Sequence, residues 1–355
     1  MQIHKFSEEY MSRQLVRQHA DVLVRLTYAG LLEREPDPDG FIHWKSRLEE
    51  TGDFPSIISG IAASQERQDV LSRILSREQV PSDDKYDIPA LIFLHAQKTA
   101  GTTLQNILVQ VYGDAAVYHE HADTLYFRSP YQLAPYTVFA GHFNYDSIRY
   151  IPRSRRNLIT IVREPKARLV SLYNFWRAHE PGHPSFARCT ELANRLDIVE
   201  FLEHPEIHEA TGTWNHMTWV VMGDRIWKEW KDRFAELAAK PNEIERTRLI
   251  MEASKAIWKR LSEFLWVGIQ EEFDASIRLL CDHLGLPYFE ELPVDHSLTK
   301  LMATDPHFKR SMTRQTISDV SPRMYELMEL DAILYKYAKT LLSGSMRNQH
   351  VQCPS

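Results

Sequence analysis

Residues 90–112 read ALIFLHAQKTAGTTLQNILVQVY and fall into three parts. The first five residues are all apolar, which is typical of a strand that is buried on both faces of a sheet. A loop with one glycine and three threonines follows, and Leu104, Ile107, Leu108 and Val111 then repeat at helical spacing. The segment therefore predicts a strand, a loop and a helix, in that order.

The same unit recurs further along the chain. Residues 158–162 (LITIV) form a second apolar run, which precedes Arg163-Glu164-Pro165 and another helical pattern. Residues 137–140 (TVFA) and 264–269 (FLWVGI) are two more strand candidates. Apolar strands that alternate with helices predict an α/β fold of three layers, with a central parallel sheet covered on both faces. Ligands of such sheets bind beyond the carboxyl ends of the strands.

The chain changes character before and after this sheet. Residues 10–79 carry apolar side chains at helical spacing, interrupted by a proline and glycine turn at residues 34–40, which predicts a small all-helical domain. A short polar stretch without period separates it from the first strand, and the last residues are polar. The predicted regions are a helical domain at 1–80, a linker at 81–87, an α/β domain at 88–343 and a frayed tail at 344–355.

The composition is that of an ordinary globular protein. The 355 residues include 42 Lys plus Arg and 48 Asp plus Glu, a net charge of −6, which argues against a protein that coats nucleic acid. Cys189, Cys281 and Cys353 are too few and too widely spaced for a disulfide framework and fit a reducing compartment. No signal-peptide pattern opens the sequence, and no apolar run reaches the ~18 residues of a membrane span. We therefore expect a cytoplasmic protein without a membrane span.

The loop at residues 95–103 has the character of an anion site. Gly101 and three threonines precede a helix N-terminus, which offers backbone N–H groups and the positive end of the helix dipole, and Lys98 adds a positive charge. A nucleoside-triphosphate P-loop would need glycines at Phe93 and Gln97. The strands identified above also end without the acidic residue that helps to hold magnesium in kinases. The sequence therefore favours an anion site without a metal and leaves a P-loop kinase as the alternative enzyme.

A second basic region lies at residues 149–168. It holds seven Lys and Arg residues against one acid, Glu164, a local charge of +6 in an acidic protein. Arg163 directly follows a predicted strand, where a guanidinium can bind a phosphate through two hydrogen bonds, and Ser171 lies two helical turns further on. Arg153 and Arg155 are predicted to be solvated. Arg163 is thus the strongest candidate for a second anion contact.

These two basic segments resemble the donor-binding motifs of sulfotransferases. Residues 95–102 (HAQKTAGT) are similar to the 5′-phosphosulfate loop of the carbohydrate branch, the glycan O-sulfotransferases, where it reads HIPKTGGT. Residues 162–173 (VREPKARLVSLY) are similar to the 3′-phosphate motif of the same family. Shorter matches extend the resemblance over residues 88 to about 343; they lie at 215–218, 267–273 and 330–338.

Several positions depart from the family pattern. Ala96 and Gln97 replace the usual Ile-Pro, Ala100 replaces a glycine, and Trp219 stands where an arginine is common. The Ala100 change adds a Cβ to a loop in which glycine has the greater conformational freedom.

The resemblance implies a P-loop-like fold and a donor, 3′-phosphoadenosine-5′-phosphosulfate (PAPS), as co-substrate. It places the 3′-phosphate on Arg163 and Ser171. The residues that it places on the 5′-phosphosulfate are Lys98, Thr99, Gly101, Thr102 and Thr103. Because a transferring sulfuryl group carries less negative charge than a phosphoryl group, Lys98 and backbone amides are expected to stabilise the bridging oxygen without a metal.

The acceptor hydroxyl needs a base, and His142 is the candidate. It follows the strand at residues 137–140, at the edge of the sheet where the donor is expected, and an imidazole can take a proton at neutral pH. In the glycan 2-O-sulfotransferase branch a Gly-His pair occupies this place and its histidine acts as the base. The alternative is a polar histidine that ends a strand. His95 is expected to orient the donor loop, and His119 and His121 are interpreted as loop histidines without a third metal ligand.

The resemblance implies an acceptor hydroxyl on a saccharide, polysaccharide or glycolipid. Trp214 and Trp219, beside Asn215 and His216, are predicted to face a sugar ring. A non-catalytic nucleotide-binding scaffold, which would have the donor site but no working base, is the alternative outside the enzymes.

The helical region resembles a bacterial domain family of unknown function that is distantly like phycobilisome linker domains. Residues that carry this resemblance include Tyr28, the turn at 34–40, Trp44 and Leu48. It implies an interaction or localisation role, with a protein partner bound through residues 1–80.

Overall fold

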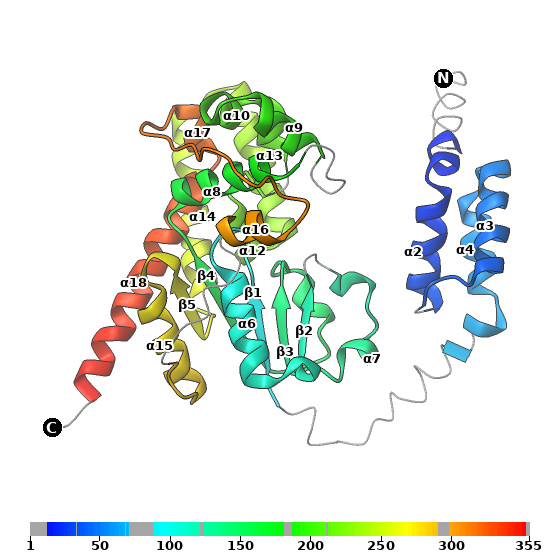
Figure 1. Ribbon diagram of the computed structural model, residues 1–355, viewed down its shortest axis with the longest axis horizontal. Coiled ribbons are helices and arrows are strands. Elements are labelled where there is room, and N and C mark those ends of the chain that lie inside the picture. The colour runs from blue at the N-terminus through cyan, green and yellow to red at the C-terminus, as the bar shows by residue number, and fades with distance from the viewer. Residues whose placement is uncertain are drawn as a thin grey trace. The chain divides into compact units, whose positions relative to one another are not determined.

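The computed structural model describes residues 13–32, 34–67, 69–70, 88–120, 124–180, 187–210, 212–289 and 298–352. These residues form two compact units (Figure 1). One contains the described residues of Met1–Asp87 and Thr124–Ala134, and the other contains those of Ile88–Asp123 and Pro135–Ser355. The predicted linker at residues 81–87 lies outside the described residues.

Among its described residues, the first unit contains α2 (Ala20–Leu32), α3 (Pro38–Thr51), α4 (Phe54–Ala62) and the short α7 (Pro130–Leu133). The apolar faces of α2, α3 and α4 enclose a core of Ala20, Val24, Tyr28, Leu32, Leu48, Ile57 and Ile61.

The turn at residues 34–40 is shorter than the sequence predicts. The Asp37 side chain caps α3 by accepting a hydrogen bond from the Gly40 N–H at 2.8 Å, so Gly40 belongs to the first helical turn. Arg34 closes this corner through Glu66, with Nε 2.5 Å from Oε1. Hydrogen bonds to Glu66, and to a smaller extent to Asp37, hold the pKa of Arg34 above its ordinary value.

The second unit is built on a five-stranded parallel sheet, which confirms the predicted α/β class with a parallel central sheet between helices. The strand order is β2-β3-β1-β4-β5, with β1 in the middle, paired with β3 on one side and β4 on the other. The strand bounds are Ala90–Leu94 (β1), Val117–Glu120 (β2), Val138–Gly141 (β3), Arg156–Val162 (β4) and Trp266–Ile269 (β5). All five residues of β1 are buried, as its continuous apolar run predicts.

Helices follow or connect these strands. α6 (Gly101–Tyr112) follows β1 and contacts β2 and β3, α8 (Pro165–Ala178) follows β4, and α15 (Phe273–Leu284) follows β5. The remaining helices are α9 (Ala187–Arg195), α10 (Ile198–Glu203), α11 (Pro205–Glu209), α12 (His216–Met222), α13 (Asp224–Ala239), α14 (Glu243–Leu261), α16 (Leu298–Thr304), α17 (Pro322–Glu326) and α18 (Glu329–Gln352).

Strand β2 is absent from the sequence prediction. Only the first two of its four residues, Val117 and Tyr118, are apolar. Within the described residues it pairs only with β3, at the edge of the sheet, so it lacks the continuous apolar run of the inner strands. His119 lies in this strand, which corrects its interpretation as a loop residue, and its Nε2 is 2.8 Å from Asp114 Oδ1. His121 lies outside the described residues.

The C-terminal helix α18 packs against β5, α8, α12 and α14. It reaches Gln352 and so covers most of the segment at 344–355 for which the sequence predicts a frayed tail. Among the described residues, no helix combines the length and the apolar character that crossing a bilayer requires.

Candidate active site

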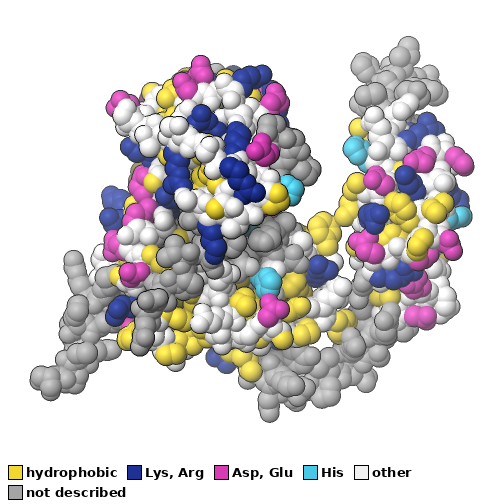
Figure 2. Space-filling view, in the orientation of Figure 1, with side chains coloured by type: hydrophobic (Ala, Val, Ile, Leu, Met, Phe, Trp, Pro, Cys, Tyr) yellow, Lys and Arg dark blue, Asp and Glu magenta, His cyan; other side chains and the backbone are white. Residues whose placement is uncertain are grey.

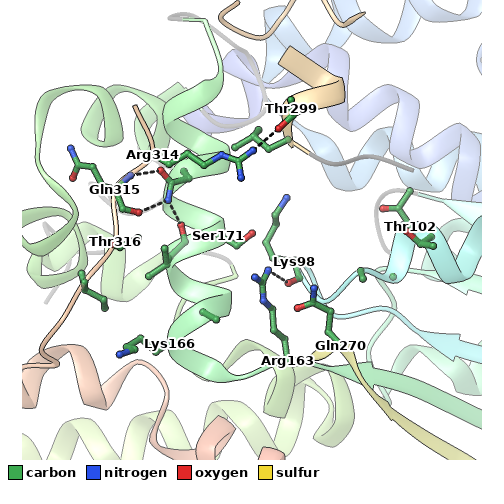
Figure 3. Close-up of a pocket in the computed structure, with 18 of the residues that line it drawn as sticks. Lys98, Thr102, Arg163, Lys166, Ser171, Gln270, Thr299, Arg314, Gln315 and Thr316 are labelled. Atoms are coloured by element: carbon green, nitrogen blue, oxygen red, sulfur yellow. Dashed lines mark hydrogen bonds between the residues drawn. The ribbon is translucent and has the colours of Figure 1, made fainter. Parts of the chain in front are cut away.

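A cavity of about 730 Å³ lies beyond the carboxyl ends of β1, β4 and β5 (Figure 3). Residues that follow these three strands form one wall. The rest is formed by α8, the start of α16 and residues 314–317. The main polar lining residues are Lys98, Gly101, Thr102, Thr103, Arg163, Lys166, Ser171, Gln270, Thr299, Arg314 and Thr316. A cavity of this size is large enough for a nucleotide.

The cavity is a cationic site. Its described lining contains Lys98, Arg163, Lys166 and Arg314 and includes no carboxylate. Figure 2 shows Lys and Arg side chains gathered on the part of the α/β unit where Figure 1 places α8, α16 and α17. Within the described residues, no group of three or more His, Cys, Asp or Glu side chains is arranged so that it could hold a metal ion. The site is therefore suited to an anionic ligand.

The loop after β1 adopts an unusual backbone conformation. Lys98 and Ala100 have φ angles of 67° and 66°, in the left-handed region that costs an L-residue about 1 kcal/mol or more. Ala100 is also the N-cap of α6 and provides no side-chain hydrogen bond there. Gly101 and Thr102 line the cavity. The first N–H groups of α6, which lack intrahelical acceptors, are therefore directed to the ligand space.

Packing against His95 explains the glycine at 101. A Cβ at this position would overlap the His95 ring. Thr99 is fully buried and its hydroxyl donates to the Ala96 carbonyl at 2.8 Å. Thr99 therefore closes the loop from behind, whereas Thr102 and Thr103 line the cavity itself.

Lys98 is largely enclosed by its surroundings. Its ammonium lies 3.9 Å from the centre of the Phe175 ring, a cation–π contact with α8. Burial, followed by repulsion from Arg163, lowers the pKa of Lys98 to about 8. An anion bound in the cavity would oppose both effects and raise the pKa of Lys98.

Arg163 connects the two predicted donor segments. Its Nη1 donates to the Lys98 carbonyl at 3.2 Å, and Figure 3 shows the two side chains next to each other. Glu271 stands behind it, with Oε1 4.0 Å from Nε, which is too long for a hydrogen bond. The buried Nε has no hydrogen-bond partner among the described residues. Arg163 therefore keeps donor capacity for a ligand, and burial lowers its pKa.

The helix after β4 already has an anion at its N-terminus. The Glu164 carboxylate accepts hydrogen bonds from Lys166 N–H at 3.1 Å and Ala167 N–H at 2.7 Å. This segment therefore offers side chains rather than backbone N–H groups to the cavity. Ser171, on α8, lines the same cavity as Arg163 and Lys98.

His142 is not one of the residues that line the cavity, but it contacts His95, which does line it. Its Nδ1 is 2.8 Å from the His95 carbonyl, and the two rings are 4.3 Å apart between centroids. Because a carbonyl can only accept, the neutral His142 ring carries its proton on Nδ1 and keeps its basic lone pair on Nε2. His95 itself lines the cavity and packs on Gly101.

A buried polar network around Arg168 and Asp331 supports the site, and the sequence does not predict it. Arg168 is fully buried and donates to the Gly212 and Thr213 carbonyls. Its Nε lies 3.8 Å from the buried carboxylate of Asp331 on α18. Because Arg168 and Asp331 are 163 positions apart, no local pattern connects them.

Three lining residues that are not predicted as site residues also belong to the site. Gln270 directly follows a predicted strand, so its position could have indicated it. Lys166 lies within the second basic segment. Arg314 comes from an irregular segment far along the chain and donates to Thr299 Oγ1 at 2.8 Å. No sequence pattern signals Arg314.

Two sequence expectations around the site are wrong. Arg153 is 5% exposed rather than solvated, because its guanidinium donates to the Tyr136 and Pro152 carbonyls. Trp214 is buried and packs edge-on against Trp227, so its ring does not form an open sugar platform. Trp219 is half-buried, stacks on His216 and donates its indole N–H to Asp224.

Comparison with known proteins identifies the group to which this chain is related. The profile of the sulfotransferase family matches residues 83–338, which include the whole sheet and every residue of the cavity. The chain belongs to the sulfotransferase family. The cationic cavity thus lies in the sulfotransferase domain, at the ligand-binding edge of its sheet.

Part of the chain is also similar to a protein-tyrosine sulfotransferase from Arabidopsis thaliana. It is 29% identical over 126 residues, which make up 34% of this chain and 25% of the plant protein. The match thus spans about a quarter of that relative's length.

Proposed function

We propose that this sulfotransferase uses PAPS as donor and transfers its sulfuryl group to a hydroxyl of a carbohydrate or glycolipid. The observation that carries the proposal is the meeting of Lys98, Arg163 and the uncapped N-terminus of α6 at one cavity without a carboxylate in its described lining. PAPS supplies an activated sulfuryl group and two separate anionic ends. The proposal covers residues 88–343, and residues 1–80 are proposed to bind a protein partner.

The 5′-phosphosulfate fits the loop after β1. Backbone N–H groups at Gly101 and Thr102, the Thr103 hydroxyl and the Lys98 ammonium would bind it, with Thr99 fixing the loop. Lys98 would stabilise the charge that develops on the bridging oxygen as the S–O bond breaks. The left-handed backbone at Lys98 and Ala100 supports this role, because strained loops of this kind occur at binding sites where the surrounding structure holds them.

The 3′-phosphate fits the other side of the cavity. Arg163 would bind it through its guanidinium and Ser171 through its hydroxyl, both of which line the cavity. Glu271 is at 4.0 Å from Arg163 Nε and orients the guanidinium without occupying its remaining donors.

His142 is proposed as the base that accepts the proton of the attacking hydroxyl. The His95 carbonyl fixes its tautomer, so Nε2 is the basic atom. A general base contributes typically ~10²–10⁴-fold in rate. The acceptor oxygen attacks sulfur, its proton passes to His142, and the bridging S–O bond breaks as charge accumulates near Lys98.

The test is transfer of labelled sulfate from PAPS to defined acceptors: unsulfated glycosaminoglycan chains, a glycolipid and an acidic tyrosine peptide. We expect label on a saccharide, and we expect His142→Ala to abolish transfer while binding of 3′-phosphoadenosine-5′-phosphate (PAP) persists. His119→Ala, which changes an exposed histidine of β2, is the matched control and should transfer normally.

Three alternatives have different outcomes in this assay and in a parallel reaction with ATP and magnesium. Label on the tyrosine peptide alone would move the acceptor class to that named for the plant relative and leave the donor assignment in place. A scaffold would bind PAP and transfer nothing. A kinase would transfer phosphate from ATP with magnesium and ignore PAPS.

A further inference from the structure

The first turn of α12 contacts both donor-binding segments. His216 Nε2 accepts a hydrogen bond from the Gln97 N–H at 3.1 Å, directly before Lys98. The next residue, Met217, accepts one through Sδ from the Arg163 N–H at 3.4 Å. A single helical turn thus touches the backbone of the loop after β1 and that of the loop after β4.

This turn is itself held rigidly from α18. The buried Asp331 carboxylate accepts hydrogen bonds from the Met217 and Thr218 N–H groups, and from the Thr218 hydroxyl at 2.9 Å. The Asn215 side chain accepts from the Leu330 and Asp331 N–H groups in return. Because each of these bonds is buried, the position of the turn is strongly determined.

The contact to Gln97 requires a neutral His216. A backbone N–H can only donate, so Nε2 is unprotonated and the ring proton lies on Nδ1. Burial, followed by the charge of Arg168 on α8 and the proximity of His142, lowers the pKa of His216 well below its ordinary value. Trp219 stacks on one face of the ring, with centroids 5.2 Å apart. His216 is therefore a fixed acceptor with one orientation.

The loop after β1 has particular need of such a contact. It contains two non-glycine residues in the left-handed region, Lys98 and Ala100, and conformations of this kind persist only where the surroundings hold them. The similar sulfotransferase motif has proline at the position of Gln97. Because proline has no N–H, this hydrogen bond to His216 depends on the replacement of proline by glutamine.

We propose that His216 is a positioning residue for the donor site, which holds the loop after β1 through Gln97 while Met217 holds the start of the loop after β4. The first turn of α12 thereby sets the separation of Lys98 from Arg163. This inference rests on the proposed function, because the separation matters only if both residues bind one donor.

The direct test is His216→Leu, which removes the acceptor and keeps a buried apolar side chain of similar size. We expect PAP to bind about tenfold more weakly in calorimetry, since the part-buried Gln97 N–H loses its partner. The KM for PAPS should rise by a similar factor, and the KM for the acceptor should not change. His208→Leu is the matched control: it changes a half-buried histidine whose Nε2 donates to the Leu202 carbonyl, and it should bind PAP as the wild type does.

Rescue and coupling separate positioning from general damage to the fold. His216→Gln carries an amide oxygen that can replace Nε2 as acceptor, so it should recover most of the affinity. Gln97→Pro removes the donor, so it should weaken PAP binding by itself. Adding His216→Leu to Gln97→Pro should then weaken binding little further, because the shared hydrogen bond is already absent.

Each outcome has one meaning. Wild-type affinity in His216→Leu, an equal loss in His216→Gln and His216→Leu, or additive losses in the double variant would each overturn the positioning role. If His216→Leu does not fold, as judged by near-ultraviolet circular dichroism, the Gln variant and Gln97→Pro decide the matter. Failure of the wild type to bind PAP would instead overturn the proposed donor, which is a different result.

Discussion

Two helices begin at the same edge of the sheet, and their N-termini differ. α6 follows β1 with Ala100 as its N-cap, which supplies no side-chain acceptor, and its first residues line the cavity. α8 follows β4 with Glu164 as its N-cap, whose carboxylate binds the Lys166 and Ala167 N–H groups. The strand-loop-helix unit is the same, but only α6 has N–H groups available to an external anion.

The difference shows that the sheet topology determines where an anion site can form. The N-cap residue then determines whether backbone N–H groups or only side chains can bind the anion. At α6 the backbone, the helix dipole and Lys98 act together on a ligand. At α8 the helix end is satisfied internally, so this segment contributes Arg163 and Ser171 as side chains. The five predictions below test this division, from the largest expected effect to the smallest.

Lys98→Ala should have the largest effect, because it removes the charge that acts on the bridging oxygen. We expect kcat to fall by about 10²–10³-fold, as for loss of one preorganised electrostatic donor. Steady-state kinetics with saturating PAPS would show it. A loss of binding with unchanged kcat would place Lys98 on the ground-state donor only.

Arg163→Ala should weaken PAP binding by about 10- to 100-fold, since charge-assisted hydrogen bonds contribute about 1.5–3 kcal/mol. Arg155→Ala, an exposed arginine of the same basic segment, is the control and should bind normally. Equal losses in both variants, measured by calorimetry, would mean that general charge rather than a fixed contact binds the donor.

The pKa of Lys98, about 8, predicts opposite pH trends for catalysis and stability. Above this pH the free enzyme loses the ammonium, so kcat/KM for PAPS should fall by up to about tenfold per pH unit. The folded state binds fewer protons than the unfolded state between about 8 and 10.5, so this group makes folding more favourable as pH rises there. The pH dependence of kcat/KM and of the free energy of unfolding should be measured for the wild type and for Lys98→Met. The variant should lack both trends, so the difference isolates the contribution of the Lys98 ammonium.

Glu164→Ala should destabilise the fold by about 1 kcal/mol, because two N–H groups of α8 lose their cap. Chemical denaturation of the variant and of the wild type measures the difference. The matching change at Glu272, the N-cap of α15 that makes no side-chain cap bond, should have little effect. Equal losses would remove the contrast between capped and uncapped helix ends.

Ala100→Gly should have the smallest effect and the opposite sign. Glycine adopts φ near 66° without the Cβ penalty, so the free energy of unfolding should rise by up to about 1 kcal/mol. The greater entropy of glycine in the unfolded chain offsets part of this gain. Thermal unfolding measures it. A lower melting temperature would show that the Ala100 methyl group makes a contact more favourable than the strain it causes.

The inner strands and the two donor segments could be predicted from the sequence because each is a local pattern. β1 and the last five residues of β4 are buried runs, Arg163 directly follows the second run, and Lys98 lies four residues after the first. β2 could not be found this way, because this edge strand has four residues and only two of them are apolar. Arg168 with Asp331, and His216 with Gln97, meet only through the fold, so their contacts have no spacing in the sequence.

The most direct measurement is thermal stabilisation by PAP, compared with AMP and with ATP plus magnesium, on the wild type and on Arg163→Ala. At ~100 times its dissociation constant PAP should stabilise the wild type by about 2.7 kcal/mol, more than AMP does, and Arg163→Ala should remove most of this gain. Stabilisation by ATP with magnesium and none by PAP would contradict the proposed donor site and favour a kinase.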